Sequence, residues 1–422
     1  MNILFIVPYT PTPIRVRPYN LIKHLTARGH RLTVAPLWSS LEEQRALAEL
    51  EAWGVRVIAA PLPRWRSLWN CLRALPTPMP LQAVYCRSPQ LRDRIEREVY
   101  DDGGRPNGAY DVIHVEHLRG AYYGLRLEGL PVVWDSVDCI SYLFEQAARD
   151  SRSLTGKWMT RFDLGRTRQY EGFLVGHFDR VLVTSQADKL ALEDLAAQAG
   201  VTALDPRANS RVVVLSNGVD LEYFRPGREE RERRTIVYLG KMSYHANVTA
   251  VVRLVHEIMP VIWQEQPEVK LYIVGANPTR QVRRLAARFP GQVEVTGTVP
   301  DVRPYLWRAS VAVAPVLYGA GIQNKVLEAM ACGAPVVATP QACAALEVVS
   351  GQDVLIAADA QQFARQVLHV LGNQDLATRL RLAGRRYVEA HHDWNVVAEK
   401  LEGVYADAVA GDKQESGRES VR

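Results

Sequence analysis

The stretch Gly319-Ala-Gly-Ile-Gln-Asn-Lys-Val-Leu-Glu328-Ala-Met-Ala-Cys-Gly-Ala-Pro335-Val-Val-Ala-Thr339 carries the strongest structural signal of the chain. Its apolar residues Ile322, Val326, Leu327 and Met330 recur at helical spacing, which predicts a helix over 322–331. Glycines precede this helix, and a strand is expected at 336–338. A helix that begins after glycines presents free backbone amides and the positive end of its dipole, and this arrangement can hold a phosphate.

Lys325 and Glu328 lie three residues apart and therefore share one face of the predicted helix. A cation and a carboxylate one turn apart suit the two ends of a nucleotide sugar. Lys325 would contact the diphosphate and Glu328 the ribose hydroxyls. The alternative is an ordinary ion pair on a solvated helix. The flanking glycines and the strand after Pro335 favour the ligand-binding interpretation.

Outward from this stretch, short apolar runs alternate with amphipathic stretches along all 422 residues, the first of them at Tyr19–Ala27. This alternation predicts βαβ units and parallel sheets that are covered on both faces. The expected strands are Ile3–Val7, Arg31–Pro36, Val55–Ile58, Val112–Val115, Pro131–Asp135, Arg180–Thr184, Arg211–Leu215, Ile236–Leu239, Lys270–Val274, Val293–Thr296, Val311–Ala314 and Val336–Ala338. Longer helices are expected at Val248–Gln264 and near Arg280–Arg288.

The segment 221–235 is rich in Arg, Glu, Pro and Gly and predicts a linker. It separates an N-terminal acceptor-binding domain at 1–220 from a C-terminal donor-binding domain at 236–393. An apolar helix at 394–410 could pack back on the first domain. The polar tail at 411–422 is expected to be disordered.

Composition narrows the class of protein. Apolar residues make up 47% and charged residues 23% of the chain, which is typical of soluble globular proteins. The net charge of +5 suits an acidic ligand without calling for nucleic acid. Five scattered cysteines form no zinc or disulfide pattern, and no apolar run reaches the ~18 residues of a membrane span. The start of the chain is typical of a buried strand rather than a signal peptide. We therefore expect a cytoplasmic protein.

Two common nucleotide motifs are missing. A dehydrogenase needs Gly-x-Gly-x-x-Gly after its first strand, but Pro8–Arg17 contains no glycine. A P-loop needs Gly-Lys followed by Ser or Thr, whereas Gly240-Lys241 is followed by Met242. The sequence thus argues against both an NAD dehydrogenase and a P-loop NTPase.

The quoted stretch resembles the donor-site signature of the GT4-like, or group 1, glycosyltransferases. Four further segments match that family in kind and order: Val214–Asp220, Tyr238–Lys241, Leu271–Gly275 and Val295–Asp301. The resemblance covers nearly the whole chain. It implies an α/β protein of GT-B architecture, in which two doubly wound Rossmann-like domains face each other across a cleft.

The resemblance also implies an activity: hexosyl transfer from a nucleotide diphosphate sugar, UDP- or GDP-linked, to a glycan or lipid-linked acceptor, usually with retention at the anomeric carbon. Lys241 and Lys325 would neutralise the leaving diphosphate, a task that fixed cations perform well. Val299 would border the nucleobase. No metal cofactor is expected to be obligatory. The remaining donor-binding residues would be Gly321, Ile322, Gln323, Asn324 and Glu328.

One position departs from the family pattern. Ala320 stands where the family often has a Glu that contacts the donor sugar. Small residues at this place resemble the sugar transferases associated with bacterial exopolysaccharide loci and PEP-CTERM protein-sorting loci. The departure leaves two alternatives open: a sugar-nucleotide epimerase or hydrolase on the same fold, or a catalytically inactive nucleotide-sugar-binding protein.

Acceptor-side residues follow strands of the first domain. Arg15 and Arg17 lie in the first strand-to-helix loop, where they could hold an anionic acceptor such as a lipid phosphate, or simply be solvated. Asp135 and Asp138 follow another strand, where they could contact sugar hydroxyls or cap a helix.

Within Asp111–His117, Glu116 falls near the position of the family's catalytic histidine. Glu116 or its neighbour His117 could orient or deprotonate an acceptor hydroxyl. His114 is interpreted as a core or surface residue.

A possible membrane surface lies near residue 70. Residues 52–92 contain six arginines and no acidic residue. Within them Trp65, Leu68, Trp69 and Leu72 fall at i, i+3, i+4 and i+7, which is the composition of an interfacial helix. Burial in the core is the alternative. We hypothesise peripheral attachment to an anionic membrane, on the inner face of the plasma membrane.

Overall fold

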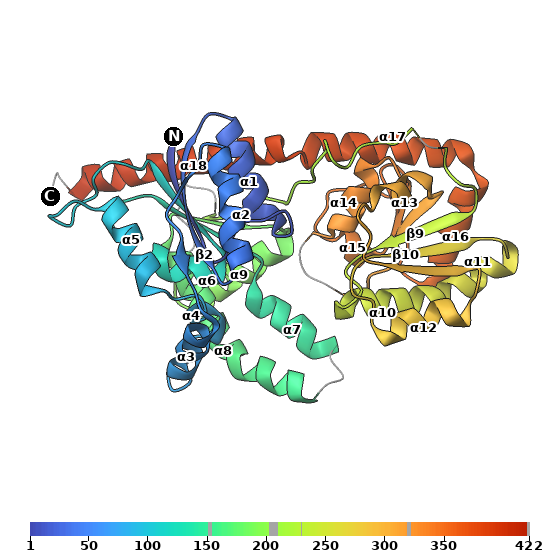
Figure 1. Ribbon diagram of the computed structural model, residues 1–422, viewed down its shortest axis with the longest axis horizontal. Helices are drawn as coiled ribbons and strands as arrows, with labels where there is room; N and C mark the ends of the chain where they lie inside the picture. The colour runs from blue at the N-terminus through green and yellow to red at the C-terminus, as the bar shows by residue number, and fades with distance from the viewer. Residues whose placement is uncertain (151–153, 202–209, 229, 319–321, 420–422) are drawn as a thin grey trace. The chain divides into compact units, whose positions relative to one another are not determined.

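The computed structural model describes residues 1–150, 154–201, 210–228, 230–318 and 322–419, with the backbone alone at 147–150, 154–161 and 412–419. The described chain forms two compact units (Figure 1). The N-terminal unit comprises Met1–Ser216 and Val397–Arg422, and the C-terminal unit comprises Asn217–Val396. Each unit is built on one parallel sheet with its own hydrophobic core.

The sheet of the N-terminal unit has eight strands in the order β3-β2-β1-β5-β6-β7-β8, with β4 paired to β2. Its strands are β1 Asn2–Val7, β2 Arg31–Trp38, β3 Arg56–Val57, β4 Ala60–Pro61, β5 Val112–Glu116, β6 Val132–Val137, β7 Arg180–Val183 and β8 Val212–Val214. The helices are α1 Val16–Ala27, α2 Leu41–Ala52, α3 Arg64–Ala74, α4 Leu81–Val84, α5 Pro89–Val99, α6 His117–Gly124, α7 Ile140–Asp150, α8 Leu154–His177 and α9 Gln186–Gln198.

The sheet of the C-terminal unit has six strands in the order β11-β10-β9-β12-β13-β14. They are β9 Thr235–Leu239, β10 Lys270–Val274, β11 Val293–Gly297, β12 Val311–Ala314, β13 Val336–Ala338 and β14 Leu355–Ile356. The helical segments are α10 His245–Arg253, η1 Leu254–Ile258, α11 Met259–Glu265, α12 Arg280–Arg288, α13 Arg303–Arg308, α14 Asn324–Ala331, α15 Pro340–Cys343, α16 Ala360–Gly372 and α17 Gln374–His391. The last helix, α18 at Trp394–Glu419, has residues in both units.

The α/β fold class with two parallel Rossmann-like sheets is confirmed. Every strand expected from the sequence is present, with ends within two residues of the predicted ones. The two-residue strands β4 and β14 were not predicted, because a pair of residues carries no readable periodicity. The helix predicted at Val248–Gln264 contains a π-helical turn before Pro260, whose missing N–H cannot continue a regular α-helical ladder.

Helix α18 differs from the sequence-based expectation in length. It runs to Glu419, beyond the end expected at residue 410 and into the predicted tail. Within the N-terminal unit it contributes Tyr405, which is fully buried and pairs with His114. None of the helices in the described part of the chain is long and apolar enough to cross a membrane.

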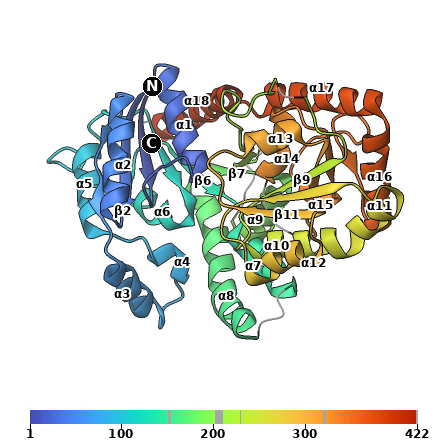
Figure 2. The same cartoon turned by 45° about the vertical axis from the view of Figure 1, so that its right-hand side comes forward.

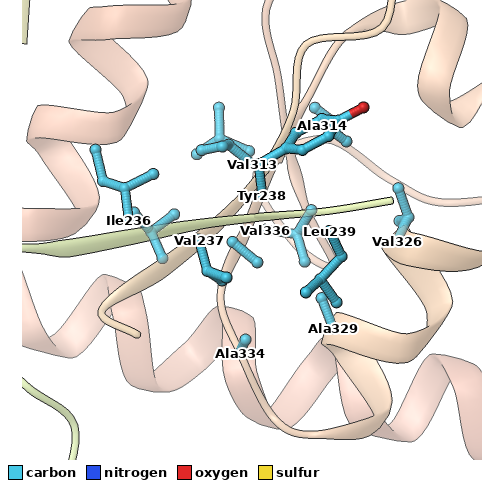
Figure 3. Close-up of a cluster of buried hydrophobic side chains, with 14 of the residues drawn as sticks. Ile236, Val237, Tyr238, Leu239, Val313, Ala314, Val326, Ala329, Ala334 and Val336 are labelled. Carbon is cyan, nitrogen blue, oxygen red and sulfur yellow. The ribbon is translucent and has the colours of Figure 1, made fainter. Parts of the chain in front are cut away.

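Helix α14 packs its apolar face into the core of the C-terminal unit. Val326, Leu327 and Met330 are buried, as the helical spacing predicted. Figure 3 shows Ala329 of α14 beside Leu239 of β9. This packing leaves Lys325 and Glu328 half-buried on the other side of the helix.

Two glycines let the loops after β9 and β10 pass each other closely. Gly240 N–H donates to Val274 O (3.1 Å), and Met242 N–H donates to Ala276 O (2.8 Å). Gly275 has φ +148°, and a Cβ at this position would overlap the carbonyl oxygen of Gly240. The close approach fixes the backbone on both sides of Lys241.

Gly275→Ala should therefore destabilise the protein strongly. We expect a loss of at least about 3 kcal/mol, because a strained φ and a backbone clash add together. Gly291 is a matched control, since it has φ +80° but open space around it. Gly291→Ala should cost only about 1 kcal/mol. Urea unfolding of the full chain, followed by circular dichroism, measures both, and equal losses would contradict the close-approach argument.

Candidate functional site

The donor-side residues predicted from the sequence follow the carboxyl ends of parallel strands. Lys241 follows β9, Val299 follows β11, and Ile322 to Glu328 follow β12. Because the strands are parallel, these ends lie at one edge of the sheet, where open α/β sheets bind ligands. Gly321 and Ala320 lie outside the described residues.

Lys325 sits among polar and aromatic groups rather than beside a carboxylate. Its Nζ donates hydrogen bonds to Asn247 Oδ1 (3.1 Å) and Gln323 Oε1 (3.0 Å), and lies 5.6 Å from the centre of the Tyr238 ring. Burial lowers the pKa of Lys325 to about 8, against the opposing effect of the Glu328 charge. The structure thus holds a largely desolvated cation that an anionic ligand would stabilise.

Glu328 is the second half of the predicted pair. Among the described residues, it forms no ion pair with Lys325 and accepts no hydrogen bond from another side chain. Burial raises its pKa to about 7, and the charge of Lys325 partly offsets that rise. The arrangement therefore differs from the solvated ion pair that the sequence left as an alternative, and it leaves the carboxylate oxygens available to hydroxyl donors.

Asn247 connects three parts of this edge, and the sequence did not identify it. Its Oδ1 accepts from the buried Tyr238 hydroxyl (2.9 Å) as well as from Lys325, and its Nδ2 donates to Lys241 O (3.1 Å). The only signal in the sequence was an amide residue in the first turn of a helix that follows a Gly-Lys loop. Asn247 therefore links the backbone of one predicted lysine to the side chain of the other.

The other donor-side residues have simpler surroundings. The Lys241 side chain is exposed. Val299 is half-buried against the core of the unit, and Ile322 is buried there. Asn324 Oδ1 is buried and has no hydrogen-bond partner among the residues that the structure describes.

Tyr318, which follows β12, joins this edge of the sheet to α10. Its hydroxyl lies 3.0 Å from His245 Nδ1 and 3.1 Å from Thr249 Oγ1, and its ring stacks on His245. The sequence analysis did not single out any of these three residues. Tyr318 is the last described residue before Ile322.

In the N-terminal unit, Glu116 is the last residue of β5 and is paired in register with Asp135 of the neighbouring strand β6. Both are buried. Tyr9 OH donates to Glu116 Oε1 (2.6 Å), while Glu116 Oε2 is buried without a partner. Burial, reinforced by the Asp135 charge, raises the pKa of Glu116 to about 8. A carboxyl group with such a pKa can exchange a proton near neutral pH.

The two predicted arginines have protein partners. Arg17 is buried and donates to Asp135 Oδ2 (2.7 Å) and to Leu215 O (2.9 Å). Arg15 donates to Thr10 O and to Glu43 Oε1 (3.0 Å), and its guanidinium lies 4.5 Å above the Tyr9 ring. The Arg15 side chain is partly exposed. Arg17 is buried and holds the Asp135 carboxylate.

His114 is a core residue, as interpreted from the sequence. It is fully buried, stacks on Phe5 at 4.0 Å and pairs through Nδ1 with Tyr405 OH (2.9 Å). Burial holds its pKa well below the ordinary value, so the ring stays neutral. The Nε2 atom of His114 lies 3.7 Å from Asp135 Oδ2.

Two residues at the ends of these strands adopt left-handed backbone conformations. His117 has φ 63° and Val137 has φ 70°. A β-branched residue in this region is strained, and such strain concentrates at functional sites. Nothing in the sequence signalled either conformation.

Asp138 follows Val137, and the structure shows that helix capping does not explain it. Glu171 accepts from the amides of Ile140 and Ser141, and Asp188 accepts from that of Cys139, so these two carboxylates bind the start of α7. Asp138 instead accepts from Thr184 Oγ1 (3.1 Å). Burial raises its pKa to about 6.

Metal ligands are not grouped in the described residues: no three His, Cys, Asp or Glu side chains are placed to hold an ion there.

Comparison with curated proteins finds mannosyltransferases. The chain is 32% identical over 240 residues to phosphatidyl-myo-inositol mannosyltransferase of Mycobacterium tuberculosis, covering 53% of this chain and 60% of that protein. It is 26% identical over 208 residues to the GDP-mannose-dependent monoacylated alpha-(1-6)-phosphatidylinositol monomannoside mannosyltransferase of Corynebacterium glutamicum, covering 45% and 55%. The chain thus matches less than two thirds of the length of these relatives.

Comparison with solved structures finds the same two-sheet fold. Anabaena HepE, in complex with UDP and glucose, superposes with a TM-score of 0.64 at 14% identity, over 96% of this chain and 99% of that one. At this identity the match shows the fold alone. It agrees with the GT-B architecture that the sequence resemblance implied.

Two family models match consecutive parts of the chain. The model described as glycosyl transferase 4-like domain matches residues 14–218, and the model described as glycosyl transferases group 1 matches residues 233–373. Together they cover most of the chain. The chain therefore belongs to the group 1, GT4-like glycosyltransferase family of GT-B fold.

Proposed function

We propose that this chain transfers a hexose from a nucleotide diphosphate sugar to a lipid-linked acceptor, with retention at the anomeric carbon. The observation that carries the proposal is Lys325 at the start of α14, a desolvated cation whose hydrogen-bond partners among the described residues are two neutral side-chain amides. Helix N-termini and fixed cations at the edge of a parallel sheet suit a diphosphate. The relatives are named as mannosyltransferases, which supports a hexosyl donor.

The donor we favour is GDP-mannose, because the Corynebacterium relative is named as dependent on it. A UDP-linked hexose is the second choice, since HepE is described with UDP and glucose. In either case Lys241 and Lys325 would stabilise charge that develops on the leaving diphosphate, and Glu328 would accept hydrogen bonds from ribose hydroxyls. Preorganised cations of this kind lower a barrier by several kcal/mol. No metal is required for that role.

The remaining donor-side roles follow from position. Backbone amides at Gly321, Ile322, Gln323 and Asn324 would donate to the phosphates at the start of α14. Val299 would border the base, and its half-buried apolar side chain suits a planar ring.

On the acceptor side, Glu116 would exchange the proton of the acceptor hydroxyl, since its pKa is close to neutral and its Oε2 has no partner. Asp135 and Asp138 would contact the acceptor. Arg17 would act through Asp135 as a positioning residue, and the partly exposed Arg15 would meet an acceptor anion.

We take the acceptor anion to be a lipid phosphate. The named relatives act on phosphatidylinositol lipids, and the motif around Ala320 supports an exopolysaccharide or PEP-CTERM-associated transferase. A lipid-linked acceptor of either pathway would place the protein at the cytoplasmic face of the plasma membrane.

A nucleotide screen tests the proposal without an acceptor. GDP or UDP should raise the thermal unfolding temperature of the chain, because a ligand that binds only the folded state stabilises it. The shift should disappear in Lys325→Ala and persist in Lys270→Ala, since Lys270 is exposed at the opposite, amino end of β10. No shift with GDP, UDP, ADP, dTDP or CMP would contradict the proposal.

Nucleotide affinity should also depend on pH. Lys325 is charged below its pKa of about 8 and neutral above it. The Kd for GDP or UDP should therefore rise as the pH increases from 7 to 9. Lys325→Arg keeps a positive charge throughout this range and should flatten the profile. Isothermal titration calorimetry measures both proteins, and parallel profiles would show that Lys325 does not contact the diphosphate.

Glu116→Gln separates catalysis from donor binding. The substitution keeps the side-chain shape but cannot exchange a proton, so kcat should fall about 10²-fold or more. Because the nucleotide-binding residues belong to the other unit, the Kd for the nucleoside diphosphate should not change. Glu98→Gln, at a partly exposed carboxylate paired with Arg56, is the matched control. Transfer of radiolabelled sugar to lipid extract reports kcat, and full activity in Glu116→Gln would remove Glu116 from the reaction.

A further inference from the structure

Helix α3 turns its apolar face away from the protein. Trp65, Leu68, Trp69 and Leu72 retain 61%, 65%, 52% and 57% of their accessible surface. Their spacing places them on one side of the helix. The tryptophans therefore do not belong to the core, which the sequence left as the alternative. A contiguous apolar face of this size on a soluble domain marks an interaction site.

The opposite side of α3 is the one that contacts the protein, and it is made of small or polar residues. Ser67 and Ala74 are buried. Asn70 Nδ2 donates to Arg87 O (2.9 Å), and Cys71 Sγ lies 3.9 Å from Leu81 O. The usual polarity of a surface helix is thus inverted. The large apolar side chains of α3 do not pack against the rest of the chain, so burying them would require a binding partner.

Arginines border the apolar face. The Arg66 guanidinium lies 4.9 Å from the Trp65 ring, and that of Arg73 lies 5.7 Å from the Trp69 ring. At the end of α3, Arg166 of α8 donates to Leu75 O (2.8 Å). Figures 1 and 2 show α3 and α4 projecting from the N-terminal unit away from its sheet.

The surroundings of α3 are basic. Residues 52–92 carry six arginines and no acidic residue, although Arg56 and Arg92 pair with Glu98 and Asp93. Arg64, Arg66 and Arg73 of α3 form no ion pair within the described residues, so a negatively charged surface would complement this helix. Tryptophan and arginine together suit the lipid–water interface, because the rings occupy the headgroup boundary while the guanidinium groups reach lipid phosphates. A protein partner would not need cations around a whole apolar face.

We propose that α3 docks the N-terminal unit on an anionic lipid bilayer. Trp65, Leu68, Trp69 and Leu72 insert at the level of the headgroups, and Arg64, Arg66 and Arg73 contact lipid phosphates. The helix lies in the membrane plane and does not span the bilayer. Docking would give the chain access to a lipid-linked acceptor, and in this respect the inference rests on the proposed function. Docking itself requires neither donor nor acceptor.

Vesicle co-sedimentation of the full chain tests the proposal in the absence of nucleotide and acceptor. The probes are vesicles of phosphatidylcholine alone and vesicles with added phosphatidylglycerol, each at low and high salt. Binding should require phosphatidylglycerol and weaken with salt. Leu68→Ala/Leu72→Ala should lower the partition coefficient about tenfold or more. Arg64→Gln/Arg73→Gln should lower it about fivefold for each arginine.

Matched control variants carry the same chemical changes elsewhere on the surface. Leu190 and Leu382 are 58% and 59% exposed, like the leucines of α3. Leu190→Ala/Leu382→Ala should bind as the unchanged chain does. Arg45→Gln/Arg365→Gln removes two exposed charges outside residues 52–92 and should change binding much less than Arg64→Gln/Arg73→Gln.

A spectroscopic readout reports insertion directly. Lipids brominated on their acyl chains should quench tryptophan fluorescence of the full chain. Quenching should be largely lost in Trp65→Phe/Trp69→Phe, which keeps an apolar face.

Three results would overturn the proposal. The first is no binding to phosphatidylglycerol vesicles at low salt. The second is equal binding by Leu68→Ala/Leu72→Ala and by its control. The third is conversion of a dimer to a monomer by Leu68→Ala/Leu72→Ala without any change in vesicle binding, because it would make α3 a contact between copies of the chain. Vesicle binding without nucleotide binding would sustain docking and refute the proposed function.

Discussion

The parallel direction of the strands is the constraint on which the rest of the structure depends. In each unit all strands run the same way, so every loop after a strand emerges at the same edge. Lys241 and Val299 lie in the loops after β9 and β11, and Lys325 lies at the start of α14 after β12. In the N-terminal unit, Glu116 and Asp135 lie at or near the ends of β5 and β6. Within each unit, the sheet alone brings these residues to the same edge. Loops at that edge are free to vary while the buried strands keep their register.

The two units treat buried charge differently. In the N-terminal unit, the buried Asp135 carboxylate is paired with the buried Arg17 guanidinium at 2.7 Å. In the C-terminal unit, the hydrogen-bond acceptors of Lys325 within the described part of the chain are neutral. A cation held in this way costs stability in the free protein, and an anionic ligand recovers that cost on binding. The pKa shifts of Lys325 and Glu116 have the same origin, which is burial without a complete set of partners.

The exposed apolar face of α3 is a further feature of the N-terminal unit. The core of the N-terminal unit is filled without the tryptophans of α3, and the helix attaches through Ser67, Ala74 and Asn70 instead. A chain that acts on a lipid-linked acceptor must reach a bilayer, and no described helix crosses one. In the docking that we propose, the exposed face of α3 and the arginines beside it would provide a reversible means of attachment.

The sequence by itself determined the strands except the two-residue β4 and β14, the two-sheet α/β class and the Lys325–Glu328 helix, because these depend on local periodicity and short-range spacing. Tertiary structure alone decided the partners of the charged residues. Asn247 meets Lys325 across 78 residues and Arg17 meets Asp135 across 118, and no local pattern encodes such pairs. It also decided which face of α3 is buried. Helical spacing defines an apolar face, but the rest of the fold determines whether that face contacts the core or the solvent.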